Sequence, residues 1–129
     1  MYWFIRPFHK RKPMKVKRIV ANVKAKNIGD AKRFYEEVLG LEELMNLGWI
    51  ATYGSNAKSI VQMSFMKEGG SGTVVPDISI EVDNVDEPYK RMKAGKFKIE
   101  YNISDEPWGV RRFFVRDPFG KLVNILSHM

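Results

Sequence analysis

Residues 19–40, IVANVKAKNIGDAKRFYEEVLG, change within one segment from a strand pattern to a helix pattern. Apolar and polar residues alternate over residues 19–25, which predicts a strand with one buried face. Turn-forming residues occupy 27–30. Apolar residues then recur at the spacing of an amphipathic helix, at Ala31, Phe34, Tyr35, Val38 and Leu39. Gly40 stands where helices commonly end in a left-handed cap.

The same order of elements occurs twice along the chain. After the first helix, strand patterns cover about residues 42–46, 49–54 and 59–66. A second unit begins with a strand at 77–82, followed by a short helix that Asp83 or Asn84 caps and Gly95 ends. Its remaining strands cover about 98–102, 110–116 and 122–127. The repeat spacing is about 57 residues, with Val20 matching Asp77.

This repetition predicts the α+β fold class. We expect two βαβββ units to form a curved, mainly antiparallel eight-stranded sheet around a cleft, with the helices on its outer face. Length predicts one domain, which we place at 16–128 with units at about 16–67 and 74–128. The segment Glu68-Gly69-Gly70-Ser71-Gly72 between the units predicts a flexible linker by composition.

The positive charge of the chain is concentrated at its N-terminal end. The 129 residues include 22 Lys or Arg and 15 Asp or Glu, a net charge of +7. Seven of these basic residues and no acid lie in residues 1–18. We therefore interpret 1–15 as a flexible basic extension, or as a misassigned start with Met14 as the true initiator. A charge confined to a tail does not predict nucleic-acid binding.

The sequence excludes several classes of function. Cysteine is absent, which excludes disulfides, thiolate catalysis and cysteine-based zinc sites and favours a cytoplasmic location. No apolar run reaches the roughly 18 residues of a membrane-spanning helix, so we expect no membrane insertion. The glycine-rich segment 68–72 lacks the Lys-Ser/Thr ending of a phosphate-binding loop.

Three motifs carry a family resemblance. They are DAKRFYEEVLGL at 30–41, EPWGVR at 106–111 and DPFGKLVN at 117–124. They resemble, in the right order, the first helix, a bleomycin-resistance-like segment and the last hairpin of the vicinal oxygen chelate superfamily. This superfamily includes glyoxalases, bleomycin-resistance proteins and dioxygenases. The resemblance covers about residues 16–128 and implies the two-unit fold described above.

The same resemblance implies where a metal ion would be held. Metal-using members bring inward-facing His and Glu side chains from the first, fourth, fifth and last strands, positions that fall on Val20, Gln62, Asp77 and Asn124. Valine cannot ligate, the two amides are weak ligands, and only one carboxylate remains. Neither His9 nor His128 is expected to contribute. We therefore predict no metal site, no cofactor and no catalytic residue, which argues against an enzyme without excluding one.

The leading functional hypothesis is a metal-free binding module for a small organic molecule. Tryptophan walls with a few placed polar groups are typical of such sites. The candidate ligand-binding residues are Asn22, Trp49, Gln62, Asp77, Ser79, Trp108, Arg111 and Asn124. Resemblance to drug-sequestering members suggests a planar or cationic antibiotic as ligand. Instead of binding a ligand, each tryptophan could serve in packing, and Asp77 could form a structural hydrogen bond.

Two other functions remain open from the sequence. One is a metal-dependent lyase, isomerase or dioxygenase of the same superfamily. The other is a regulatory or interaction domain with a vestigial cleft. Members of the superfamily often pair their units between chains, so the resemblance also implies a homodimer.

Overall fold

The computed structural model describes residues 13–55 and 61–129, in which eight strands form a single mixed sheet. The strand order is β2-β3-β4-β1-β5-β8-β7-β6. The strands are β1 (Val16–Lys24), β2 (Glu42–Asn46), β3 (Ile50–Ser55), β4 (Val61–Met66), β5 (Ile78–Val82), β6 (Ile99–Asp105), β7 (Val110–Arg116) and β8 (Leu122–His128). The predicted α+β fold with a repeated unit is confirmed. The predicted strand start at Ser59 lies outside the described residues.

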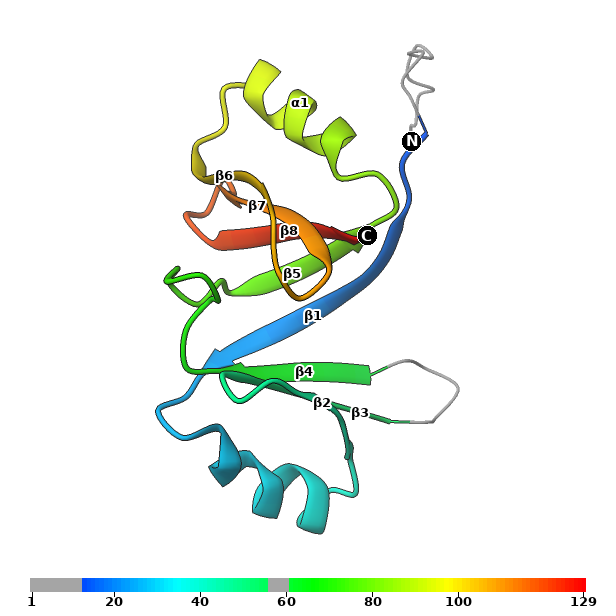
Figure 1. Cartoon of the computed structure of the whole chain (residues 1–129), viewed down its shortest axis with the longest axis vertical. Coiled ribbons are helices and arrows are strands. Elements are labelled where there is room, and N and C mark those ends of the chain that lie inside the picture. Colours follow the sequence, from blue (N-terminus) through cyan, green and yellow to red (C-terminus); the bar gives the residue numbers. More distant parts are fainter. Residues whose placement is uncertain (1–12, 56–60) are drawn as a thin grey trace, which may run out of the picture.

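The two units join through their first strands. β1 and β5 pair antiparallel, with Val20 opposite Ser79. Inside each unit the first and last strands pair parallel, β1 with β4 and β5 with β8. Figure 1 shows the helices of the two units at opposite ends of the molecule, with β1 running between the two halves of the sheet.

Each unit has its own hydrophobic core between its strands and its helix. In the second unit the core contains Val82, Val85, Phe113, Val115, Val123 and Ile125, with Tyr89 and Met92 of helix α1 (Asp86–Ala94) packed against it. In the first unit it contains Ile28, Ala31, Ala51, Tyr53 and Phe65. Each large apolar side chain among them stabilises the fold by about 1.5–3 kcal/mol on burial. The faces of β4, β5 and β8 that carry Phe65, Val82 and Ile125 are therefore the ones that pack into the cores.

The first helix differs from its prediction. The chain forms a short 3-10 helix, η1 (Ile28–Asp30), and then a π-helix, η2 (Lys32–Val38). Hydrogen bonds from residue i+5 to residue i place more residues in each turn than the 3.6 of an α-helix. The predicted apolar stripe is consequently wrong in part, because Phe34, Val38 and Leu39 are 58%, 72% and 57% exposed. Ala31 and Tyr35 do reach the core.

The ends of these helices also correct the sequence analysis. The predicted capping of α1 by Asp83 or Asn84 is wrong, because the N-cap is Val85, which makes no side-chain cap hydrogen bond. Asp83 instead accepts a hydrogen bond from the backbone N–H of Lys15. Gly40, by contrast, has the left-handed φ of +78° expected after the first helix.

Residues 1–12 of the predicted extension lie outside the described residues. Residues 14 and 15 contact the second unit, because Met14 packs against its core and Lys15 exchanges hydrogen bonds with Asp83. Within the described ranges, no helix is long and apolar enough to cross a membrane.

Candidate ligand-binding cavity

A cavity of about 180 Å³ lies on the inner face of the sheet, lined by strands of both units. Its apolar lining consists of Val20, Met45, Leu47, Trp49, Ile50, Met66, Trp108, Val110 and Leu126. Its polar lining consists of Arg18, Asn22, Thr52, Ser64, Ser79, Arg112, Asn124 and His128. Apolar walls with a few polar groups are typical of small-molecule sites.

The polar floor of the cavity comes from two equivalent strand pairs. Asn22 of β1 lies opposite Ser64 of β4, and Ser79 of β5 lies opposite Asn124 of β8. The Nδ2 atoms of Asn22 and Asn124 donate hydrogen bonds of 2.9 and 3.1 Å to the Ser79 hydroxyl. Thr52 and Ser64 share a buried hydrogen bond of 2.7 Å. The floor therefore carries uncharged hydrogen-bonding groups from both units.

One buried acceptor of the floor residues has no hydrogen-bond partner among the described residues. Asn124 is only 6% exposed, and its Oδ1 atom has no hydrogen-bond partner among the described residues. An unsatisfied buried acceptor costs about 1–3 kcal/mol, so it is expected to meet a donor from outside the fold. This group is therefore a candidate contact for a ligand.

Trp49 and Trp108 form one wall of the cavity. Their ring centroids lie 5.1 Å apart with the planes inclined by 62°, an edge-to-face contact. Both rings press on Gly70, where a Cβ atom would lie 2.7 Å from Trp108 and 2.8 Å from Trp49. Gly70 also has a φ of +88°, a conformation that favours glycine. The wall is thus fitted against the segment between the units.

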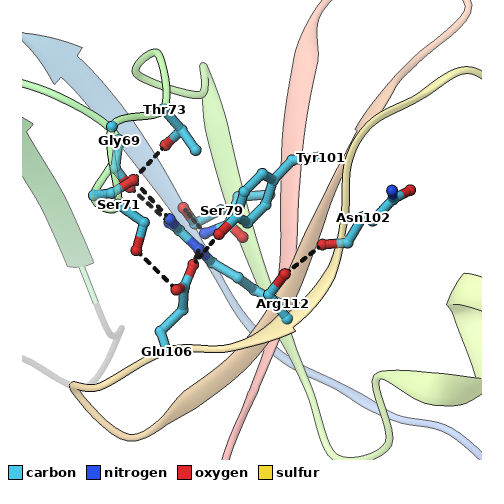
Figure 2. A network of polar contacts seen from close by, with 12 residues as sticks. Gly69, Ser71, Thr73, Ser79, Tyr101, Asn102, Glu106 and Arg112 are labelled. Atoms are coloured by element: carbon cyan, nitrogen blue, oxygen red, sulfur yellow. Dashed lines mark hydrogen bonds and ion pairs between the residues drawn. The ribbon is translucent and has the colours of Figure 1, made fainter.

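A buried ion pair holds that segment in place (Figure 2). The Arg112 guanidinium donates to Glu106 Oε2 at 2.6 Å and to the carbonyl oxygens of Gly69 and Gly70 at 2.6 and 3.1 Å. It also lies 5.0 Å from the centre of the Trp108 ring. Gly69 and Gly70 are buried. The prediction of a flexible linker is therefore wrong for these two residues, because their carbonyls satisfy a buried cation.

Glu106 is the centre of the same network. Burial by itself raises the pKa of this carboxyl, but hydrogen bonds from Ser71, Arg112 and Tyr101 outweigh it, and the pKa lies below its usual value. The Ser71 and Tyr101 hydroxyls donate at 2.8 and 3.0 Å. Glu106 is therefore a carboxylate at neutral pH and balances the charge of Arg112.

A second polar cluster stands beside the cavity. Arg18 donates to Glu81 and to Gln62, which occupies the neighbouring strand of the first unit. His128 Nε2 lies 3.6 Å from the other oxygen of Glu81. Arg18 and His128 line the cavity, while Glu81 is not part of the lining. The cation of Arg18 is thus already paired.

The cavity brings together five of the eight predicted ligand-binding residues, namely Asn22, Trp49, Ser79, Trp108 and Asn124. Three others lie elsewhere. Gln62 contacts the cavity residue Arg18. The carboxylate of Asp77 accepts from the backbone N–H of Leu122 at 2.9 Å, the structural role given as its alternative. Arg111 forms ion pairs with Asp86 and Asp105.

The donor set does not suit a divalent metal ion. Across residues 13–55 and 61–129, no group of three or more His, Cys, Asp or Glu lies close enough together to hold one. Of the four positions implied by resemblance, only Val20 and Asn124 line the cavity, and they offer an alkyl group and an amide. The residues present therefore do not fit the metal centre that the resemblance implies.

Sequence reasoning missed several lining residues. Ser64 stands on the same strand face as Gln62, so the alternation of β4 already contained it. His128, which was considered only as a metal ligand, lines the cavity because β8 extends to this residue. Arg112 alternates with Arg111 along β7, and its burial had no separate sequence signal.

Comparison with known proteins agrees with this architecture. A family model described as Glyoxalase/Bleomycin resistance protein/Dioxygenase superfamily matches residues 17–125. No curated protein sequence matches the chain.

Solved structures share the fold at low sequence identity. A chain described as NAD-dependent benzaldehyde dehydrogenase from Legionella pneumophila has a TM-score of 0.70 and 16% identity, covering 87% of this chain and 100% of that one. A glyoxalase/bleomycin resistance protein/dioxygenase superfamily member from Vibrio splendidus has a TM-score of 0.59 and 21% identity, covering 88% and 99%. A single-residue variant of Streptomyces coelicolor methylmalonyl-CoA epimerase has a TM-score of 0.67 and 16% identity, covering 88% and 99%.

Proposed function

Because the chain belongs to the Glyoxalase/Bleomycin resistance protein/Dioxygenase superfamily, we propose that it binds a small organic molecule in its cleft without a metal ion. The observation that carries this proposal is a largely apolar cavity whose floor includes Asn124, a residue with a buried acceptor that has no partner among the described residues. Such a cavity supplies binding energy through its walls and orientation through a few polar groups. Membership of the bleomycin-resistance-like branch stays a prediction.

The charges around the cavity argue against a cationic ligand. The ionisable side chains in the lining are Arg18, Arg112 and His128. Arg18 and Arg112 neutralise the carboxylates of Glu81 and Glu106, so neither carboxylate is left to attract a cation. The cationic antibiotic suggested by resemblance is therefore less well supported than an uncharged molecule.

A thermal-unfolding screen of chelator-treated protein tests the proposal. The panel contains Ni²⁺, Zn²⁺, Mn²⁺ and Fe²⁺ beside uncharged organic compounds and cationic antibiotics. A ligand present at about 100 times its Kd adds about 2.7 kcal/mol to the free energy of unfolding. We expect a saturable rise in Tm with an uncharged compound. A saturable rise with a metal ion alone would overturn the metal-free proposal and favour a metalloenzyme.

A homodimer in the cytoplasm belongs to the same proposal. The outer side of β1 supports the dimer, because Val16, Ile19 and Val23 are 55%, 61% and 38% exposed on this strand. Exposed apolar side chains grouped along one element are typical of protein interfaces. The absence of cysteine supports the cytoplasmic location.

A further inference from the structure

We infer that the cavity is built for an uncharged single-ring molecule whose hydroxyl group binds to Asn124 and Ser79. This inference rests on the proposed function and narrows it to a class of ligand. Three features of the cavity lead to it, namely its volume, the hydrogen-bonding capacity of its floor and the nature of its walls.

The volume limits the ligand to about one ring. The cavity holds about 180 Å³. An apolar cavity of about 150 Å³ accommodates benzene, whereas sites for drug-sized molecules measure about 300–1,000 Å³. A ring with one or two small substituents therefore fills the space, whereas a large antibiotic would extend beyond it.

The floor of the cavity is complementary to a ligand group that both donates and accepts a hydrogen bond. The buried Oδ1 atom of Asn124 can accept a hydrogen bond and has no donor among the described residues. The Ser79 oxygen already accepts from the amides of Asn22 and Asn124, so both of its lone pairs are occupied. Its own O–H is then available only as a donor. A ligand hydroxyl satisfies both, because it donates to Asn124 and accepts from Ser79.

The surroundings favour the uncharged form of that hydroxyl. Asn22, Ser64, Ser79 and Asn124 are neutral, and an anion placed here would face the Asn124 carbonyl oxygen. The walls favour a ring, because Trp49 and Trp108 stand on one side and aliphatic side chains such as Val20 and Leu126 also line the space.

Calorimetric titration of three matched compounds tests the inference. Phenol carries the hydroxyl, anisole keeps the oxygen as an acceptor only, and benzene carries neither group. One net hydrogen bond corresponds to about a three- to tenfold change in affinity. We expect phenol to bind by that factor more tightly than benzene and anisole.

Substitution of Asn124 on the floor tests whether this residue causes the preference for phenol over benzene. In Asn124→Leu the open acceptor is gone and the volume is nearly kept, so benzene should still bind while the advantage of phenol disappears. Asn102→Leu, at an exposed position on β6, is the matched control and should keep that advantage. Should Asn124→Leu fail to fold, Ser79→Ala removes the hydroxyl donor and should reduce the advantage instead.

The outcomes separate this inference from the proposed function. Equal binding of phenol and benzene would overturn the hydroxyl assignment, with a water molecule satisfying Asn124, and leave the proposed function standing. Binding of larger organic molecules but of no single-ring compound would overturn the size argument alone. A panel in which no organic molecule binds would overturn both.

Discussion

At the scale of single residues, Gly70 is the point where the inter-unit segment meets the tryptophan wall. Substitution by alanine forces a side chain into a φ of +88° and brings its Cβ within 2.8 Å of both rings. The left-handed conformation alone costs about 1–2 kcal/mol for a residue with a Cβ. We expect Gly70→Ala to lower the free energy of unfolding by more than that cost. The substitution should also change the near-UV circular dichroism of the tryptophans.

Gly72 provides the control for this prediction. Its φ is +77°, but the space around a Cβ there is open among the described residues. Gly72→Ala should therefore carry only the conformational cost and leave the tryptophan signal unchanged. Urea unfolding measures both variants. Equal losses of stability would show that the contacts with Trp49 and Trp108 are unimportant.

Glu106 gives the pH dependence of the fold. Because its pKa is lower in the folded protein than in the unfolded chain, its contribution to stability is present above the unfolded value of about 4.3. The contribution is lost as the pH falls through the folded value. Glu106→Gln should therefore lose less stability between about pH 5 and pH 3 than the wild-type chain.

The surface residue Glu100 provides a control for the dependence of stability on pH. A hydrogen bond from Arg116 is the largest cause that lowers the pKa of Glu100, but solvent screens this exposed pair. Glu100→Gln should flatten the acid limb of the Tm profile less than Glu106→Gln does. If the two variants change the profile equally, the buried network does not govern acid stability.

At the scale of elements, the strands were predictable and the first helix was not. Alternation identifies strand faces because side chains point to opposite sides of the backbone, and this held for Phe65, Val82 and Ile125. Helical periodicity assumes 3.6 residues in each turn, whereas η2 adopts π-type bonding. Val38 and Leu39, which were predicted to belong to the apolar face of the helix, are therefore exposed to solvent and do not pack into the core.

This difference predicts that substitutions at Val38 and Phe65, both in the first unit, change the free energy of unfolding by unequal amounts. Val38→Lys should change the free energy of unfolding by less than about 0.5 kcal/mol, because the side chain is exposed. Phe65→Ala should cost about 3–5 kcal/mol, because Phe65 packs against Tyr35 and Tyr53 in the core. Denaturant unfolding measures both. A large loss for Val38→Lys would restore the predicted helical stripe.

At the scale of the whole molecule, the cavity depends on how the two units join. Alternation along the predicted strand 77–82 places Asp77 and Ser79 on one face, but it does not show that the strand begins only at Ile78. The antiparallel pairing of β1 with β5 puts Ser79 opposite Val20 in the cavity, while Asp77 lies just before β5 and bonds to the next strand's backbone. The pairing of distant strands has no local signal, which is why Arg18, Arg112 and His128 were not chosen.

The outer side of the same junction predicts the assembly state. Ile19 and Val23 are exposed on β1, between the two helices that cover the ends of the sheet (Figure 1). If a second copy of the chain covers them, the double variant Ile19→Lys, Val23→Lys should convert a dimer into a monomer because buried unpaired charges are costly. Light scattering measures the change. Val74→Lys, at an exposed apolar residue between β4 and β5, should leave the dimer intact. A wild-type monomer would contradict the dimer, and a dimer that survives the double variant would place the interface on another surface.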